Sequence, residues 1–483
     1  MSFSKPARCS AFQLSSPVMH FSSAFAALGL FVATSLAAPT ALHTIETFSG
    51  ETTGRHIVTL KEGVSKASLI AQIKQNATIT HEFDIINGFA GHFDEDTLNA
   101  LRASPDVELI GEDGIMHTMV TQYATAWMTS IPADAYIKDQ CTMGYITIEL
   151  EYKAEQPEYR VREIPVSVTH GLSFSHQFVS ALTFTYTYDS AAGAGVDIFI
   201  VGILTTHTQF GGRARWGETF GPYANTERPY PTAIEMATAT GLTARMFKYY
   251  THAAVLLTRR TFSGTAAGSQ YGVAKSANLV AVKVLSDAGS LKIGCRNRHV
   301  RYDGEKGISE LTELCSVSGL NFVLSSATRP TVASMSLGGG ASTALDNAVA
   351  SLTRGGVHVT VAAGNDGADA GNTSPARSPS ANTVGATTIA DARASFSNFG
   401  SVVDIFAPGQ NVISAWSTSN TATNNISGTS MATPHVAGLI AYLISVRGNM
   451  SPAAMTSLLQ SLSLKGVISG VPSGTINDLG HNA

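Results

Sequence analysis

Near its C-terminal end the chain reads Gly428-Thr429-Ser430-Met431-Ala432-Thr433-Pro434-His435-Val436-Ala437-Gly438, in which a serine follows a glycine turn. The apolar residues that come next, Leu439 to Leu443, predict a buried helix that begins at this turn. Unpaired backbone N–H groups and the positive end of the helix dipole at such a start would favour a developing oxyanion. Ser430 is therefore predicted to be a catalytic nucleophile; the alternative is an ordinary helix-capping serine.

Composition places the chain among globular proteins with room for more than one domain. It has 483 residues, of which 44 are glycine and 14% are charged, and its net charge at pH 7 is -4. Because this balance offers no basic field for nucleic acid, we expect no nucleic-acid partner. A secreted hydrolase is compatible with it.

The N-terminal residues predict export. An apolar stretch from Phe25 to Leu36 follows basic residues and ends in Ala37-Ala38-Pro39, so we interpret residues 1–38 as a secretory signal peptide. Met19 could equally be the true start, which would leave a more compact signal. We therefore expect a secreted, extracellular protein with no membrane span elsewhere. Four glycosylation sequons agree with this route, at Asn76, Asn372, Asn425 and Asn449.

The cysteines do not form an obvious framework. With Cys9 in the signal peptide, the others are an odd set that cannot all pair internally, namely Cys141, Cys295 and Cys315. None of them has the spacing of a zinc ligand, so zinc is not expected.

Residues 55–117 have the pattern of a small α+β domain. The expected elements are a strand over 57–60, a helix from about residue 65, a hairpin with Asn87-Gly88, a helix capped by Asp94 and a strand over 107–110. This order is that of a ferredoxin-like module.

Beyond about Leu182 the pattern becomes α/β. Near-continuous apolar runs, typical of parallel strands covered on both faces, lie over 196–201, 279–284, 332–336 and 357–363. Leu345, Val349 and Leu352 form a helical stripe between the last two runs. The alternation predicts a parallel sheet with helices on both sides, whose strand ends carry the functional site.

Two further motifs leave these strands. An amide side chain, Asn365, follows a glycine turn in Val361-Ala362-Ala363-Gly364-Asn365-Asp366-Gly367, and small residues that permit close backbone approach stand in Ser336-Leu337-Gly338-Gly339-Gly340. Taken singly, each could be an ordinary turn or glycine loop. Together with the serine motif they resemble the subtilisin-like serine proteases, the subtilases, and in particular the secreted members similar to proteinase K.

That resemblance implies a fold and a domain order. Residues 182–483 would form a subtilisin-like three-layer α/β domain with a parallel sheet, preceded by an atypical junction over 123–181. Residues 39–122 would be a ferredoxin-like α+β propeptide that inhibits the same molecule until it is cleaved. The protein would be a monomer that acts on polypeptide substrates and has no membrane partner.

The resemblance also implies roles for individual residues. Ser430 would be the nucleophile, Asn365 an oxyanion-hole donor, and an extended substrate would lie beside Ser336, Leu337 and Gly338. No cofactor would be required. A structural calcium ion is implied at Asp404 with the carbonyls of Pro379 and Ala381, although three ligands do not complete its shell and a solvated aspartate is the alternative.

The other two members of a catalytic triad do not match the family pattern. Subtilases carry Asp-Thr-Gly directly after the first core strand, but here Val201 is followed at once by Gly202. Asp197 lies some four residues before the expected position. Since each residue of a strand adds about 3.3 Å, it cannot simply substitute for the missing aspartate. The histidine motif appears as Arg260-Thr261-Phe262-Ser263-Gly264-Thr265, without its histidine. The histidines elsewhere do not match it either, so no triad aspartate or histidine is assigned among residues such as His207, His252 and His435.

Three stretches also depart from the family pattern, about 123–178, 225–260 and 291–315. Two interpretations are open. Either intervening sequence has been read through in the translation of an intact protease gene, with some coding sequence lost, or the chain is a diverged one. The sequence therefore predicts a secreted serine endopeptidase; the alternative is a catalytically inactive homologue that binds peptides in the same site.

Overall fold

The computed structural model describes residues 42–73, 77–120, 188–189, 192–201, 203–220, 262–284, 312–417 and 419–482. Several predicted features lie outside these residues: the signal peptide, the junction, the stretch 225–260, most of 291–315, His252, Asn76 and the cysteines other than Cys315. From Leu42 onward the described residues belong to one compact unit.

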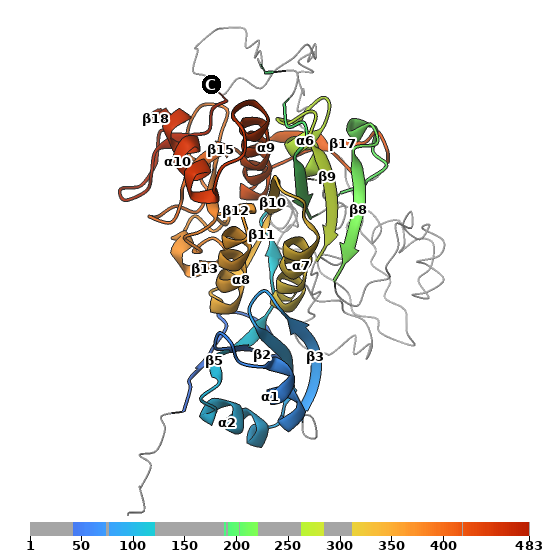
Figure 1. The fold of residues 1–483 in the computed structure, drawn as a ribbon. Helices are drawn as coiled ribbons and strands as arrows, with labels where there is room; N and C mark the ends of the chain where they lie inside the picture. The colour runs from blue at the N-terminus through green and yellow to red at the C-terminus, as the bar shows by residue number, and fades with distance from the viewer. Residues whose placement is uncertain are drawn as a thin grey trace, which may run out of the picture. The chain divides into compact units, whose positions relative to one another are not determined.

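The N-terminal part is an α+β unit with a five-stranded sheet of order β1-β5-β2-β4-β3 (Figure 1). Its elements are β1 (Ile45–Glu46), β2 (Thr52–Leu60), α1 (Lys66–Ile73), β3 (Ala77–Phe83), β4 (Gly88–Phe93), α2 (Glu95–Ala103) and β5 (Val107–Gly114). The predicted turn is confirmed, because Asn87 adopts a φ of 41° between β3 and β4. The predicted cap is confirmed too, since the Asp94 carboxylate accepts the Thr97 N–H at 2.8 Å.

The C-terminal part is built on a nine-stranded sheet of order β18-β19-β15-β14-β12-β10-β7-β9-β8. Its strands are β7 (Asp197–Ile200), β8 (Ala214–Thr219), β9 (Asn278–Lys283), β10 (Thr331–Met335), β12 (His358–Ala362), β14 (Asn382–Thr387), β15 (Ile405–Pro408), β18 (Leu464–Lys465) and β19 (Asp478–Leu479). All neighbours are parallel except β18 and β19. Every residue of β10, β12 and β14 is buried, so both faces of the sheet are covered, as the apolar runs predicted.

Helices surround this sheet (Figure 1). They are α6 (Ser263–Ala267), α7 (Glu313–Ser326), α8 (Thr343–Arg354), α9 (Thr429–Arg447) and α10 (Pro452–Leu462), with the 3₁₀ turns η1 (Thr208–Phe210) and η2 (Ala370–Asn372). α9 contacts β10, β12, β14 and β15 and is the central helix of the domain. Among the described residues it alone is long and apolar enough to cross a membrane, but 89% of that window is buried in the fold. Its apolarity is therefore that of a core helix.

Two small sheets complete the fold. One has the order β13-β11-β6 and joins β13 (Thr373–Ser374), β11 (Leu337–Gly340) and β6 (His117–Thr118). The other is the hairpin of β16 (Val412–Ala415) and β17 (Thr423–Ile426). Since β6 follows the N-terminal α+β unit and β11 follows β10, the first of these sheets joins the two parts of the chain.

Candidate active site

Ser430 is the second residue of α9, and the glycine turn before it determines its position. Gly428 precedes the helix with φ 153°, a conformation that favours glycine. The Ser430 hydroxyl donates to the Ser336 carbonyl oxygen at 3.1 Å, and the Ser336 hydroxyl donates to the Ser430 carbonyl oxygen at 3.0 Å. This reciprocal pair fixes the start of α9 against the end of β10, so the predicted serine and the predicted substrate segment do lie together.

Asn365 lies beside the same helix start. It follows β12 through Gly364, which has φ 108°. Its side-chain Oδ1 accepts the backbone N–H of Thr429 at 2.8 Å and the Thr429 hydroxyl at 2.9 Å. The Thr429 hydroxyl in turn accepts the Gly364 N–H at 3.2 Å. Because both donors hold Oδ1, the amide nitrogen of Asn365 faces away from Thr429; it is buried without a partner among the described residues.

A second asparagine, Asn398, holds the loop that carries Asn365. Its Oδ1 accepts the N–H groups of Asp366 at 2.9 Å and Ala368 at 3.0 Å, and its Nδ2 donates to the Ala363 carbonyl at 3.0 Å. The residue is completely buried. No local sequence pattern indicates this role, because Asn398 lies more than 30 residues after Asn365.

Residues Met116–Met119 lie along β11. β6 pairs antiparallel with β11, with Thr118 opposite Leu337 and His117 opposite Gly338. The seam continues where the Met119 N–H donates to the Ser336 carbonyl at 3.3 Å. A Cβ at Gly338 would stand 2.5 Å from Met119 Cε, so glycine is what lets the two segments approach.

The Met119 carbonyl reaches the serine turn. Its oxygen accepts the backbone N–H of Ser430 at 3.0 Å. A Cβ at Gly428 would clash with that oxygen and would stand 3.3 Å from Asn365 Nδ2. The Met119 carbonyl oxygen and the unpartnered Asn365 Nδ2 therefore both lie beside Gly428. An oxyanion at the position of that oxygen could accept hydrogen bonds from two donors, the Ser430 N–H and Asn365 Nδ2.

Asp197, which the sequence excludes as the triad aspartate, does not lie near this point. It is the first residue of β7 and stands opposite Thr331, the first residue of β10, whereas Ser336 follows the last. Along β10, the position opposite Asp197 and Ser336 are five residues apart, which is roughly 16 Å. Burial opposes ionisation of Asp197, but hydrogen bonds from Arg215 at 2.8 Å and Asn278 at 3.1 Å outweigh it and lower its pKa. Asp197 thus belongs to a structural ion pair.

The two histidines that the structure describes among the candidates are also committed elsewhere. His207 accepts the Gln209 N–H at Nδ1, 3.2 Å away, and its Nε2 lies 2.9 Å from the Ala422 carbonyl. His435 lies one turn after Ser430 with its Nδ1 2.8 Å from the Met431 carbonyl, and burial lowers its pKa to about 4. Within the described ranges, no histidine is recorded at the Ser430 hydroxyl.

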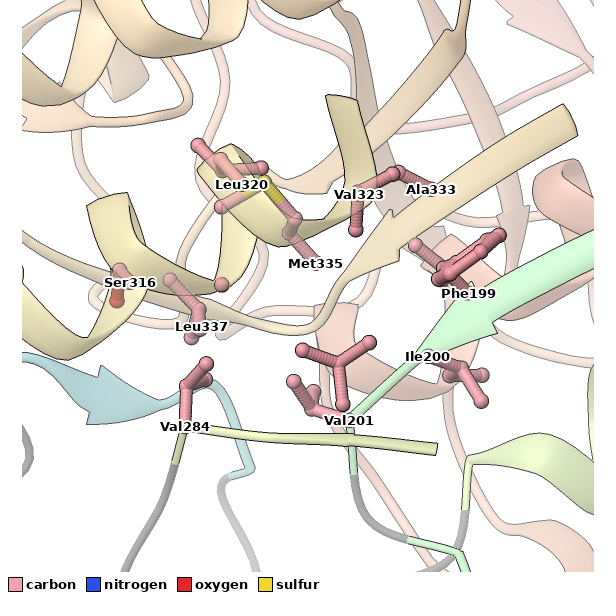
Figure 2. Close-up of a pocket in the computed structure, with 13 residues that line it drawn as sticks. Phe199, Ile200, Val201, Val284, Ser316, Leu320, Val323, Ala333, Met335 and Leu337 are labelled. Atoms are coloured by element: carbon pink, nitrogen blue, oxygen red, sulfur yellow. The ribbon is translucent and has the colours of Figure 1, made fainter. Parts of the chain in front are cut away.

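The end of β7, where subtilases carry the triad aspartate, borders a small apolar cavity instead. Figure 2 shows side chains from β7, α7 and β10 around it, among them Phe199, Leu320 and Met335. Its volume is about 30 Å³, space for about one water molecule. The Ser316 and Ser334 hydroxyls in its lining are buried without partners among the described residues. The cavity is too small to hold a substrate side chain.

The predicted calcium ligands lie beside β14. The Asp404 carboxylate accepts the Thr383 N–H at 2.7 Å, and burial raises the pKa of Asp404 to about 6. Pro379 and Ala381 belong to the loop that leads into β14. A half-buried carboxylate with an oxygen to spare fits a hard cation, but no group of three or more His, Cys, Asp or Glu side chains gathers anywhere in the described part of the chain.

Comparisons with known proteins show the family to which the chain belongs. Residues 261–473 match the subtilase family, peptidase S8, and residues 55–119 match the peptidase inhibitor I9 family. A subtilisin-like serine protease of Davidiella tassiana, Cla h 9.0101, is 36% identical over 84% of this chain and 68% of its own length. A cuticle-degrading protease of Metarhizium anisopliae is 35% identical over 89% of both chains.

A solved structure of a cold-adapted subtilisin-like serine proteinase aligns with 36% identity and a TM-score of 0.51, covering 65% of this chain and 99% of that one. The chain belongs to the subtilase family of serine proteases and carries an inhibitor I9 propeptide domain before its peptidase domain. Its fold is the subtilisin-like α/β fold that the sequence predicted.

Proposed function

We propose that this chain is the precursor of a secreted serine endopeptidase in which Ser430 is the nucleophile. Asn365 Nδ2 and the Ser430 N–H would stabilise the oxyanion, and β11, after Ser336, would bind an extended substrate. The observation that carries the proposal is the Met119 carbonyl, which accepts the Ser430 N–H at 3.0 Å beside the unpartnered Asn365 amide. This is the placement that a scissile carbonyl requires.

The same contact supports a processing site. Residues Met116–Met119 lie along β11, the proposed peptide-binding strand, and the next bond along the chain, Met119–Val120, would be the one that Ser430 attacks. In our proposal the propeptide inhibits the site by lying in it like a substrate, and cleavage of this bond would start its release. The sequence predicted the propeptide as 39–122, which includes this bond.

Catalysis in this form needs a base that the described residues do not supply. Attack by Ser430 requires a group that takes the hydroxyl proton and an acid that later protonates the leaving amine. In the proposal these groups come from residues that follow Val201 and precede Phe262 in the native protein. A structural calcium ion at Asp404, with the Pro379 and Ala381 carbonyls, would add stability without taking part in the reaction.

A pseudoprotease is the second candidate, because Asp197, His207 and His435 are all held in contacts away from Ser430. Such a protein would bind peptides along β11 and leave them intact. Loss of the histidine alone costs a subtilisin, a relative of this chain, about 10⁶ in kcat. Without a base the chain would be nearly inactive.

Export and a monomeric state complete the proposal. Among the sequons, Asn372, Asn425 and Asn449 are exposed in the structure and accessible to glycosylation. The relatives named above are fungal proteases, one of them described as cuticle-degrading, and we propose an extracellular location for this chain as well.

Two measurements on the native secreted protein separate the candidates. Peptides across Val196 to Gly319, mapped by mass spectrometry, should contain Asp-Thr after Val201 and a histidine in the motif before Ser263. An alkylphosphonate probe should then label Ser430, because labelling needs an activated hydroxyl. Peptides with the Val201-Gly202 junction and an unlabelled serine would instead establish the pseudoprotease.

A further inference from the structure

A short segment before the I9 match, Ile45–Gly50, also contacts the peptidase domain. The match begins at residue 55, yet β1 adds a parallel strand to β5, with Ile45 opposite Ile110 and Glu46 opposite Gly111. A Cβ at Gly111 would stand 3.9 Å from the Glu46 Cβ and 3.7 Å from its Oε2. The Glu46 side chain therefore extends across the face of β5 that glycine leaves open.

The Glu46 carboxylate ends at the first turn of α8. It accepts the Thr343 N–H at 3.2 and 3.0 Å and the Thr343 hydroxyl at 2.8 Å. Arg377 Nη2 lies 3.5 Å from the same carboxylate, and Arg377 Nε binds Asp346 at 2.6 Å. α8 has 12 residues, so its positive N-terminal end and the Arg377 guanidinium both favour a negative charge here.

The next residues extend the contact along β11. The Phe48 ring is buried, and its ring edge lies 3.1 Å from where a Cβ of Gly339 would stand. A Cβ at Gly340 would stand 2.5 Å from the Ser49 carbonyl oxygen. Ile45–Gly50 thus continues the seam that Met116–Met119 begins, and two glycines of β11 make room for it. Figure 1 shows β5 below α8, and the two are in contact.

We infer that Ile45–Gly50 is an accessory docking arm of the propeptide, with the Glu46 carboxylate bound to α8 and Arg377 as its main polar anchor. The arm rests on the proposed role of the propeptide as inhibitor. The arm also determines which inhibitors fit the peptidase domain. An inhibitor that docks like the propeptide needs a carboxylate at the start of α8 as well as a strand on β11. Substrate peptides that fill β11 alone lack that contact.

Hydrogen exchange of the full chain, followed by mass spectrometry, tests the arm without requiring catalysis. Glu46→Ala should speed exchange of the Thr343 amide and of the β11 amides Leu337–Gly340 by about 10-fold or more, because a charge-assisted anchor is lost. Glu46→Gln, which keeps the shape and removes the charge, should give a smaller increase. The matched control Glu108→Ala, an exposed carboxylate on β5, should leave both sets unchanged.

Two results would overturn the arm. One is unchanged exchange at Thr343 and β11 in Glu46→Ala. The other is faster exchange that spreads to β2 and β4, because Glu46 would then stabilise the propeptide fold rather than its docking. Failure of the protease proposal would appear separately, as an unlabelled Ser430 in the phosphonate experiment, while the exchange pattern stayed as expected.

Discussion

The two sides of the active site differ in how completely the described chain builds them. The serine side is continuous: hydrogen bonds of 2.8 to 3.2 Å join Thr429 to Asn365 and fix the start of α9 to the residues that follow β10 and β12. The base side, at the end of β7 and the start of α6, presents apolar residues such as Val201 and Phe262. The residues proposed to form the oxyanion site are therefore in place, whereas the described residues supply no proton-transfer group beside Ser430.

The difference teaches that binding and chemistry are separable in this fold. The serine side needs only backbone N–H groups, glycines and one amide, and it already holds the Met119 carbonyl. The base side needs an ionisable pair in one exact arrangement. We therefore expect the serine side to persist through large changes in neighbouring sequence, whereas loss of a few residues removes the base side.

The largest expected effect comes from Ser430→Ala in the native secreted protein. If a base reaches Ser430, hydrolysis of a chromogenic peptide should fall by about 10⁶, the loss seen for the serine of a subtilisin, a relative of this chain. The control Ser461→Ala, on the exposed face of α10, should keep full activity. Equal and negligible rates for parent and Ser430→Ala would mean that the base side is truly absent.

Asn365→Ala should have the next largest effect. It removes a side-chain donor beside the Met119 carbonyl, so kcat should fall by about 10²–10³ with little change in KM, as for a subtilisin, a relative of this chain. Steady-state kinetics measure both constants. Asp366→Asn changes the next residue of the same turn and should leave kcat near the parent value. A matching loss in both variants would assign the effect to the turn and not to the amide.

His435 allows the serine side to be tested through the pH dependence of stability. Its pKa is lowered from 6.5 to about 4, so the unfolded chain binds a proton that the folded chain rejects. The stability it contributes is present above pH 6.5 and is lost as pH falls toward 4, by up to about 3 kcal/mol. Thermal unfolding between pH 7 and 4 should show a shallower decline in His435→Gln than in the parent.

The matched variant for that measurement is His207→Gln. Its ring is buried against Ala422 and Gln209 and lies outside α9, so this variant measures what removal of a buried imidazole does elsewhere in the fold. Should His435→Gln instead abolish hydrolysis at neutral pH while the fold is retained, His435 would be part of the base side after all.

Thr429→Val should have the smallest effect. It removes the hydroxyl that donates to Asn365 and accepts from Gly364, but keeps the backbone N–H that also holds Asn365. Loss of one of two hydrogen bonds should lower kcat about 10-fold. Thr429→Ser should recover most of the rate, and a Thr429→Ser variant as slow as Thr429→Val would show that the methyl group matters instead.

The fold could be predicted from the sequence because its signals are local. The turn at Asn87, the cap at Asp94 and the stripe of Leu345, Val349 and Leu352 each depend on neighbours within a few residues, and all are found as predicted. The apolar runs of the parallel strands are equally local, since burial on both faces demands them.

The parts of the site that could not be predicted depend on distant pairs. Asn398 holds the Asn365 loop, Met119 reaches Ser430, and Glu46 reaches Thr343 across nearly 300 residues of sequence. No periodicity or turn chemistry encodes such pairs. The commitment of Asp197 to Arg215 likewise became visible only when β7 and β8 were placed on either side of β9.

The strand pairing between β6 and β11 also protects the protein from aggregation with other copies of the chain. In the order β13-β11-β6, removal of β6 would leave β11 as an edge strand with open backbone donors and acceptors. Such edges are templates on which other chains aggregate. While the propeptide is attached, β6 covers that edge. A newly made chain can therefore fold at high local concentration without exposing an aggregation-prone strand, which becomes free only after the propeptide has left.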